Sequence, residues 1–109
     1  MDIERSGRVV VVRGSGELDA FAVADLDAAF AEVGDERRIV ADLERVSFMD
    51  STALGVLVRR VRELLEAGAG VRVVLPRGTA RRIFEITALD GALPIAPDRT
   101  TALDELDSV

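Results

Sequence analysis

The spacing of apolar residues along the chain predicts four or five strands. A turn signal at Ser6 and Gly7 precedes the β-branched run of residues 9–12, and together they favour a hairpin whose second strand is buried on both faces. The short apolar runs at residues 39–43 and 71–75 are interpreted as further strands, and a loop containing Val46 and Phe48 is expected after the first of them. Residues 93–95 predict a short edge strand, where a proline is tolerated.

Apolar residues at helical spacing predict helices between these strands. The first helix is expected at residues 22–33, with Asp19 placed to cap its start and Gly34 placed to end it. The most regular pattern follows Asp50, where one continuous apolar stripe runs along residues 54–65. This stripe predicts the longest helix of the chain.

Two more helices are predicted near the end of the chain. One is expected at residues 79–89, and a last short helix is expected at residues 101–106, where Thr101 and Asp104 resemble a capping box. Strand–helix–strand units favour parallel pairing with right-handed crossovers, and the opening hairpin adds an antiparallel pair. The predicted fold class is therefore α/β, with a small mixed β-sheet of four or five strands and about four α-helices.

Length and composition fit one domain covering residues 1–109. Hydrophobic residues make up 49% and charged residues 31% of the chain, which disfavours disorder. Twenty acidic against fourteen basic residues give a formal charge of -6, which argues against a nucleic-acid partner. We expect a cytoplasmic protein, because no run reaches the roughly 18 to 20 apolar residues of a membrane span and no secretory signal is recognised. Monomer and weak dimer both stay open.

The residue types that are missing exclude most enzyme chemistry. The chain has no Cys or His, and all fourteen of its basic residues are Arg. Disulfides, thiolate or imidazole metal sites, His-based general catalysis and Schiff-base lysines therefore cannot be built. We expect a protein that is not an enzyme and that uses neither a cofactor nor a metal.

Glycines and arginines give weaker signals. The glycine-rich residues 14–16 are a weak candidate for a phosphate-binding loop, because Asp19 stands where a dinucleotide fingerprint needs its third glycine and no Lys exists for a P-loop. A turn leaving the strand is the preferred interpretation. Gly55, inside the long helix, fits either close packing or a binding surface. The arginines at positions 59, 60 and 62 are interpreted as a solvated helix face.

Ser51 is the most informative position for function. It is predicted at the first turn or the N-cap of the long helix, near unpaired backbone N–H groups and the positive end of the helix dipole. One role is a hydrogen-bonded cap worth about 1 kcal/mol. The other role is a phosphorylation site, because a helix N-terminus stabilises phosphate and the added charge beside Asp50 would change surface recognition.

Two segments resemble the STAS domain family, and within it the bacterial anti-sigma factor antagonists. They are Gly-Glu-Leu-Asp at residues 16–19 and Val-Ser-Phe-Met-Asp-Ser-Thr-Ala-Leu-Gly-Val-Leu at residues 46–57. Residues 77–89, which end in Thr-Ala-Leu, are similar to the family's third helix. The resemblance covers nearly the whole chain and implies a small mixed sheet with helices packed mainly on one face.

The resemblance implies a function in partner switching. An unphosphorylated antagonist of this family binds an anti-sigma factor, so that a sigma factor is released to activate transcription. The anti-sigma factor is often a serine kinase, which uses ATP to phosphorylate the antagonist and end the interaction, and a phosphatase resets the cycle. The phosphoacceptor position corresponds to Ser51, and Asp19 and Asp50 match acidic positions near it.

Two residues depart from the family motif. Thr52 stands where many members have a second Ser, and Ala53 replaces the usual Gly, so that an extra methyl is expected at the interface and could alter partner choice. The alternative function is a constitutive STAS subunit of a stress-sensing complex or of a lipid-transport system, since such proteins share the fold. The expected partner-binding residues are Asp19, Asp50, Ser51, Thr52, Ala53 and Gly55.

Overall fold

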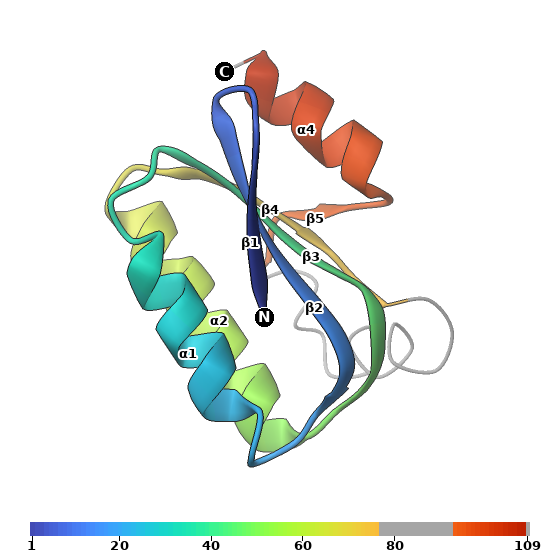
Figure 1. Cartoon of the computed structure of the whole chain (residues 1–109). Coiled ribbons are helices and arrows are strands. Elements are labelled where there is room, and N and C mark those ends of the chain that lie inside the picture. The colour runs from blue at the N-terminus through green and yellow to red at the C-terminus, as the bar shows by residue number, and fades with distance from the viewer. Residues whose placement is uncertain (77–92, 109) are drawn as a thin grey trace.

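The chain folds around a five-stranded mixed sheet (Figure 1). The computed structural model describes residues 1–76 and 93–108. The strands lie side by side in their sequence order, with β1 antiparallel to β2 and the other neighbours parallel, which confirms the predicted hairpin and mixed sheet. The elements are β1 (Asp2–Ser6), β2 (Val9–Leu18), α1 (Val23–Glu32), β3 (Arg38–Met49), α2 (Ser51–Glu66), β4 (Gly70–Val74), β5 (Ile95–Ala96) and α4 (Arg99–Asp107).

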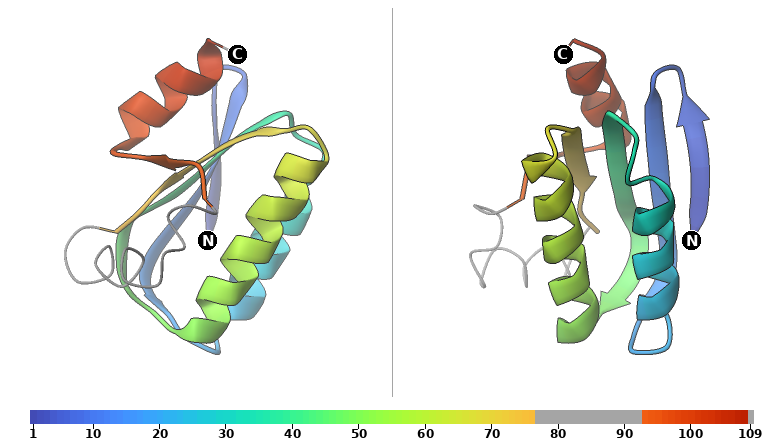
Figure 2. Two further views of the ribbon diagram at one scale, coloured as in Figure 1. Left: turned by 180° about the vertical axis from the view of Figure 1, so that it is seen from behind. Right: turned by 90° about the vertical axis from the view of Figure 1, so that its left-hand side faces the viewer.

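A hydrophobic layer covers each face of the sheet, so that β2 is buried on both of its faces. Val10 and Val12 belong to the larger core, which contains the buried residues of α1 and α2. Val9 and Val11 belong to a smaller core, to which Leu106 of α4 contributes. Figure 2 shows α1 and α2 side by side, and Figure 1 shows the sheet between this pair and α4. Successive valines of this run therefore point alternately into the two hydrophobic layers.

The helices differ in part from the expected arrangement. The described residues contain three helices rather than about four, and the helix predicted at residues 79–89 lies outside the described residues. Two of these three helices share one face of the sheet, and α4 packs on the opposite face. The expectation of helices mainly on one face holds for α1 and α2 only.

β2 and β3 continue beyond the apolar runs that predict them. The predicted turn at residues 14–16 is wrong, since β2 runs through these residues to Leu18. The loop predicted after residue 43 is also wrong, because β3 continues to Met49. The register of the pair shifts after Arg13 and again after Gly16, where φ is +71°, so the strands bend without separating. Both strands consequently end at one edge of the sheet.

α4 begins earlier than the sequence predicts. Its N-cap is Asp98, whose carboxylate accepts a hydrogen bond from the backbone N–H of Thr101 at 2.7 Å. The predicted capping box of Thr101 and Asp104 is wrong, because Asp98 already caps the helix and Thr101 lies inside it.

Two short ion pairs join elements that are distant in the sequence. Arg99 Nη2 of α4 lies 2.6 Å from Glu4 Oε2 of β1, and Arg60 Nε of α2 lies 2.7 Å from Asp27 Oδ1 of α1. The hydrogen bond from Arg99 lowers the pKa of Glu4 below its usual 4.5. The hydrogen bond from Arg60 likewise lowers the pKa of Asp27 below its usual 3.8. Both carboxylates therefore hold their charge more firmly in the folded chain.

We expect these two ion pairs to make the fold acid-sensitive. Because the folded-state pKa values of Glu4 and Asp27 are lowered, the unfolded chain takes up protons first as the pH falls, and the free energy of unfolding decreases with it. The decrease should begin at about pH 5 and continue through the lowered pKa values. Urea denaturation between pH 7 and pH 3 measures it. The double variant Arg60→Gln, Arg99→Gln should lose less stability over this interval, and an equal loss would contradict the assignment.

Candidate functional site

The carboxyl ends of β2 and β3 meet at one edge of the sheet (Figure 1). Leu18 pairs with Met49 in the parallel register, and the backbone N–H of Asp50 donates a hydrogen bond to the Leu18 carbonyl at 3.2 Å. Asp19 directly follows the first strand and Asp50 directly follows the second. The fold thereby brings together the two acidic segments that the sequence motifs single out. We call the surface formed by residues 16–25 and 46–55 the acidic edge.

Asp50 is the residue that caps α2. Its backbone is extended, with φ -81° and ψ 173°, and its Oδ1 accepts a hydrogen bond from the backbone N–H of Ala53 at 2.8 Å. Its carbonyl accepts a second hydrogen bond, from the N–H of Leu54 at 3.0 Å. Asp50 thus fixes where α2 begins and satisfies N–H groups of the first turn.

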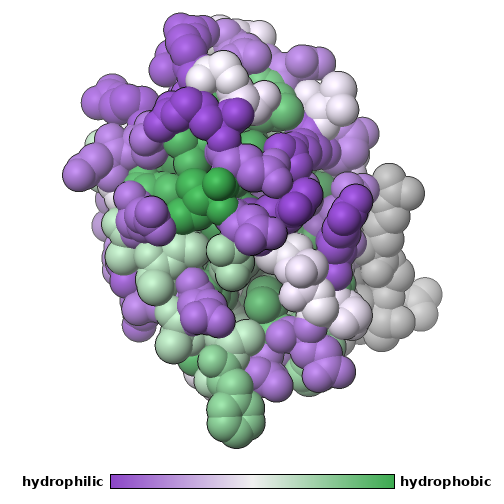
Figure 3. All heavy atoms as spheres, in the orientation of Figure 1, coloured by the Kyte–Doolittle hydropathy of each residue, from purple (hydrophilic) through white to green (hydrophobic). Residues whose placement is uncertain are grey.

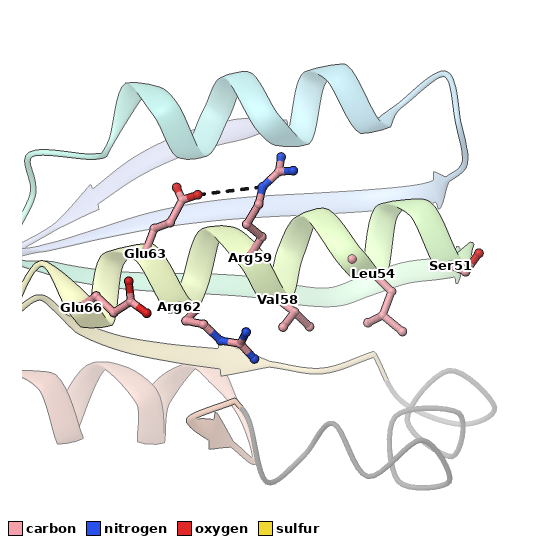
Figure 4. Close-up of a pocket in the computed structure, with 8 residues that line it drawn as sticks. Ser51, Leu54, Val58, Arg59, Arg62, Glu63 and Glu66 are labelled. Carbon is pink, nitrogen blue, oxygen red and sulfur yellow. Dashed lines mark ion pairs between the residues drawn. The ribbon is translucent and has the colours of Figure 1, made fainter.

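Ser51 is the first residue of α2 and lies on the surface. The cap role considered for its hydroxyl is wrong, since Asp50 performs it. Figure 4 shows the Ser51 hydroxyl at the very end of the helix, directed away from the chain. A phosphate on this oxygen would displace no core side chain, and the positive end of the helix dipole would stabilise its charge. The neighbouring Thr52 is also exposed.

Asp19 shapes the loop between β2 and α1. Its Oδ1 accepts hydrogen bonds from the backbone N–H groups of Phe21 at 3.0 Å and Ala22 at 3.1 Å. The helix itself begins at Val23, and its N-cap, Ala22, makes no side-chain cap bond. Asp19 therefore holds the turn that precedes α1. The prediction that Asp19 caps this helix is wrong.

Ala53 and Gly55 occupy different environments on α2. Ala53 is 0% exposed and belongs to the larger core, so the expectation that its methyl reaches the interface is wrong. Gly55 is exposed, and within the described part of the chain a Cβ at this position would meet no heavy atom within 4 Å outside its own helix. Close packing against these residues therefore does not explain the glycine.

A hollow runs along the outer side of α2 from Ser51 (Figure 4). Leu54 and Val58 provide its apolar part, and the charged side chains farther along include Arg59 and Glu63, whose Nε and Oε1 lie 3.9 Å apart. The charges along it are balanced, so the hollow has no excess of cations for a phosphate group. Its lining in the described residues comprises Ser51, Leu54, Gly55, Val58, Arg59, Arg62, Glu63 and Glu66.

Removal of the Asp50 carboxylate is expected to destabilise the fold moderately. Asp50→Ala leaves the N–H of Ala53 without its side-chain acceptor and should lower the free energy of unfolding by about 1 kcal/mol. Asp50→Asn keeps an acceptor oxygen and should lose much less. Urea denaturation of both variants measures the difference, and equal stabilities would show that the cap contributes nothing.

Comparison with known protein families decides the identity of the fold. The profile of the STAS domain matches residues 1–102. The chain belongs to the STAS domain family. This STAS domain is 40% identical over 84 residues to the anti-sigma F factor antagonist of Lysinibacillus sphaericus, covering 73% of the chain and 71% of that relative. It is 30% identical over 113 residues to the anti-sigma F factor antagonist of Paenibacillus polymyxa, covering 100% of the chain and 96% of that relative.

Solved structures agree with this assignment. An anti-sigma factor antagonist from Mycobacterium paratuberculosis superposes on the STAS domain with a TM-score of 0.86 and 32% identity, covering 96% of this chain and 91% of that chain. The Bacillus cell fate determinant SpoIIAA in its phosphorylated form gives a TM-score of 0.71 and 30% identity, covering 95% of this chain and 96% of that chain. SpoIIAA has also been solved in an unphosphorylated form.

Two exposed phenylalanines of the STAS domain are not among the predicted site residues. Phe21 is 92% exposed and Phe48 is 49% exposed, and both lie on the acidic edge. The sequence offers one signal for Phe21, which falls just before the apolar stripe of the first predicted helix. In residues 1–76 and 93–108 no helix is long and apolar enough to cross a membrane.

Proposed function

We propose that this STAS domain is an anti-sigma factor antagonist that works as a phosphorylation-controlled partner switch. Ser51 is the phosphoacceptor, the partner is an anti-sigma factor that acts as a serine kinase, and a phosphatase removes the phosphate from phospho-Ser51. The observation that carries the proposal is the exposed Ser51 hydroxyl at the first position of α2. The protein regulates sigma-factor-dependent transcription by binding, without catalysis of its own.

The geometry of the acidic edge supports this switch. The surface residues Asp19, Asp50, Ser51, Thr52 and Gly55 gather where two strands and a helix meet, so a bound partner would cover the hydroxyl. A phosphate would add about -1.5 to -2 charges at this place without disturbing the core. SpoIIAA, which is 30% identical to this STAS domain and has been solved in a phosphorylated form, adds support for control by phosphorylation.

A constitutive STAS assembly subunit is the weaker candidate. It is motivated by the shared fold and by the departure of Ala53 from the antagonist motif, and the methyl of Ala53 is buried in the core. The hydroxyl that a regulated antagonist needs is kept and accessible. The antagonist function therefore has the better support.

The proposal is tested by identifying the partner and then the phosphate. A Ser51→Ala bait retains the partner from the cells that make the protein, and mass spectrometry identifies it; we expect an anti-sigma factor with an ATP-binding kinase domain. Incubation of the wild-type protein with this partner and ATP should add one phosphate, located on Ser51 by peptide mapping. Thr52→Val, the control, should still accept it. A phosphate elsewhere, no phosphate, or transporter subunits in place of a kinase would overturn the proposal.

A further inference from the structure

Large exposed hydrophobic side chains are concentrated near Ser51. In the described part of the chain there are four, of which Phe21 and Phe48 are 92% and 49% exposed, while Ile3 and Leu65 are 37% and 39% exposed. Both phenylalanines lie on the acidic edge, whereas Leu65 lies near the other end of α2. Single exposed apolar residues are common, but two exposed aromatic residues on the same acidic edge as Ser51 indicate an interaction surface.

The exposure of Phe48 follows from an irregularity in β3. Val46 is buried, and strict alternation would also turn Phe48 toward the core. The register with β2 skips Ser47, so Phe48 pairs with Glu17 on the outside while Met49 packs against the core. A one-residue bulge in β3 therefore exposes the ring of Phe48 to solvent. Phe48 directly precedes Met49, whose pairing with Leu18 is the last of the two strands.

Hydrogen bonds hold the backbone at the exposed Phe21 in place. The N–H of Phe21 donates to Asp19 Oδ1 at 3.0 Å, and the N–H of the next residue donates to the same oxygen at 3.1 Å. Figure 3 shows apolar atoms protruding at the lower end of the molecule, where Figure 1 places the loop between β2 and α1. A ring with two rotatable bonds on a held loop loses little conformational entropy when it is buried by a partner.

The charges around the two rings define the partner's chemistry. Residues 16–25 and 46–55 contain four acidic residues and no basic residue; the four are Glu17, Asp19, Asp25 and Asp50. Arg13 of β2 lines a hollow together with Glu17 and Asp25 and offsets part of this charge. A partner that buries the two rings still faces a net negative surface, which Arg or Lys side chains on its contact surface would complement.

We propose that Phe21 and Phe48 are the apolar anchors that hold the anti-sigma factor on the acidic edge. Each ring fills an apolar pocket of that protein, and the rim of the pockets carries basic side chains that face Glu17, Asp19 and Asp25. The inference rests on the proposed function and deepens it: the two rings supply affinity, and Ser51, on the same acidic edge, supplies control. Anchoring residues of this kind contribute most of the binding free energy of an interface.

The test uses the anti-sigma factor identified with the Ser51→Ala bait, and every variant carries Ser51→Ala so that phosphorylation cannot interfere. Titration calorimetry should give a Kd raised at least thirtyfold by Phe21→Ala, which corresponds to about 2 kcal/mol. Phe48→Ala should raise the Kd about tenfold. The matched control is Leu65→Ala, which removes an exposed apolar side chain from the far end of α2 and should change the Kd less than threefold.

The outcomes separate the inference from the function on which it rests. Phe21→Ala removes a side chain that is 92% exposed, so its thermal unfolding should match that of the parent, and a lost affinity then reports recognition alone. If Phe21→Ala and Phe48→Ala bind like Leu65→Ala while the parent binds tightly, the anchor role of the two rings is refuted. The proposed phosphorylation-controlled switch is then unaffected. If the parent binds no anti-sigma factor, the proposed function fails and the inference fails with it. A partner surface without basic residues, or an association rate that does not fall as salt is added, overturns the charge assignment.

Discussion

Phosphorylation of Ser51 is expected to weaken binding of the anti-sigma factor more than a hundredfold. The phosphate adds about -1.5 to -2 charges beside Asp50, in a surface that the bound partner covers. The partner's basic side chains face Glu17, Asp19 and Asp25, so the phosphate is buried without a cation of its own. Such burial costs several kcal/mol, and about 3 kcal/mol already changes the Kd more than a hundredfold. Titration calorimetry with the phosphorylated and unphosphorylated proteins measures the ratio.

Charged and uncharged variants of Ser51 should bracket this effect. Ser51→Ala should bind as tightly as the unphosphorylated protein and should not be released by ATP, whereas Ser51→Asp should bind weakly. The control is Ser108→Asp, which places a carboxylate at another exposed serine, at the end of α4, and should leave binding unchanged. The switch would be refuted by Ser51→Ala and Ser51→Asp binding alike.

The same phosphate should leave the fold intact. Negative charge at a helix N-terminus is stabilising, and Ser51 is exposed, so the phosphorylated protein should unfold at the same temperature as the unphosphorylated one or slightly above it. Loss of binding can therefore be attributed to the interface. This separation is possible because the cap of α2 is Asp50 and not Ser51.

The sequence predicts the elements that follow one clear period. The apolar stripe of α2 and the valine run of β2 are continuous patterns, and the structure confirms both elements. The motif segments at residues 16–19 and 46–57 also indicate the site, because parallel pairing brings their two ends together. The local pattern of apolar residues was sufficient to predict an element wherever that pattern continued through a single helix or strand.

The predictions from the sequence fail where contacts with neighbouring segments decide between two locally possible structures. Alternation breaks where the register of β2 and β3 shifts, so the sequence pattern suggests a turn and a loop in place of strand. The same shift hides the outward orientation of Phe48. Asp50 and Ser51 are both good capping residues, and only the backbone geometry shows that Asp50 takes the cap. The burial of Ala53 likewise depends on how α2 is rotated against the sheet.

Truncation of Leu57 is expected to be the most damaging single change to stability considered for this chain. Leu57 is 0% exposed on the inner side of α2, and Leu57→Ala should lower the free energy of unfolding by about 2–5 kcal/mol and the Tm by more than about 10 °C. The matched control is Leu65→Ala, the same replacement on the same helix at a side chain that is 39% exposed, for which we expect a loss of under about 1 kcal/mol. Similar losses from both variants in urea denaturation would contradict the packing of α2.

Leu57→Ala also separates stability from recognition. Leu57 lies six positions beyond Ser51 and has no exposed surface, so it cannot contact a partner directly. At a temperature where the variant is still folded, its Kd for the anti-sigma factor should therefore equal that of the wild-type protein. Near its lowered Tm the apparent affinity should fall only by the fraction of molecules that are folded. A Kd that rises well below the Tm would mean that core packing under α2 positions the acidic edge, and recognition would then depend on the helix as a whole and not on its exposed residues alone.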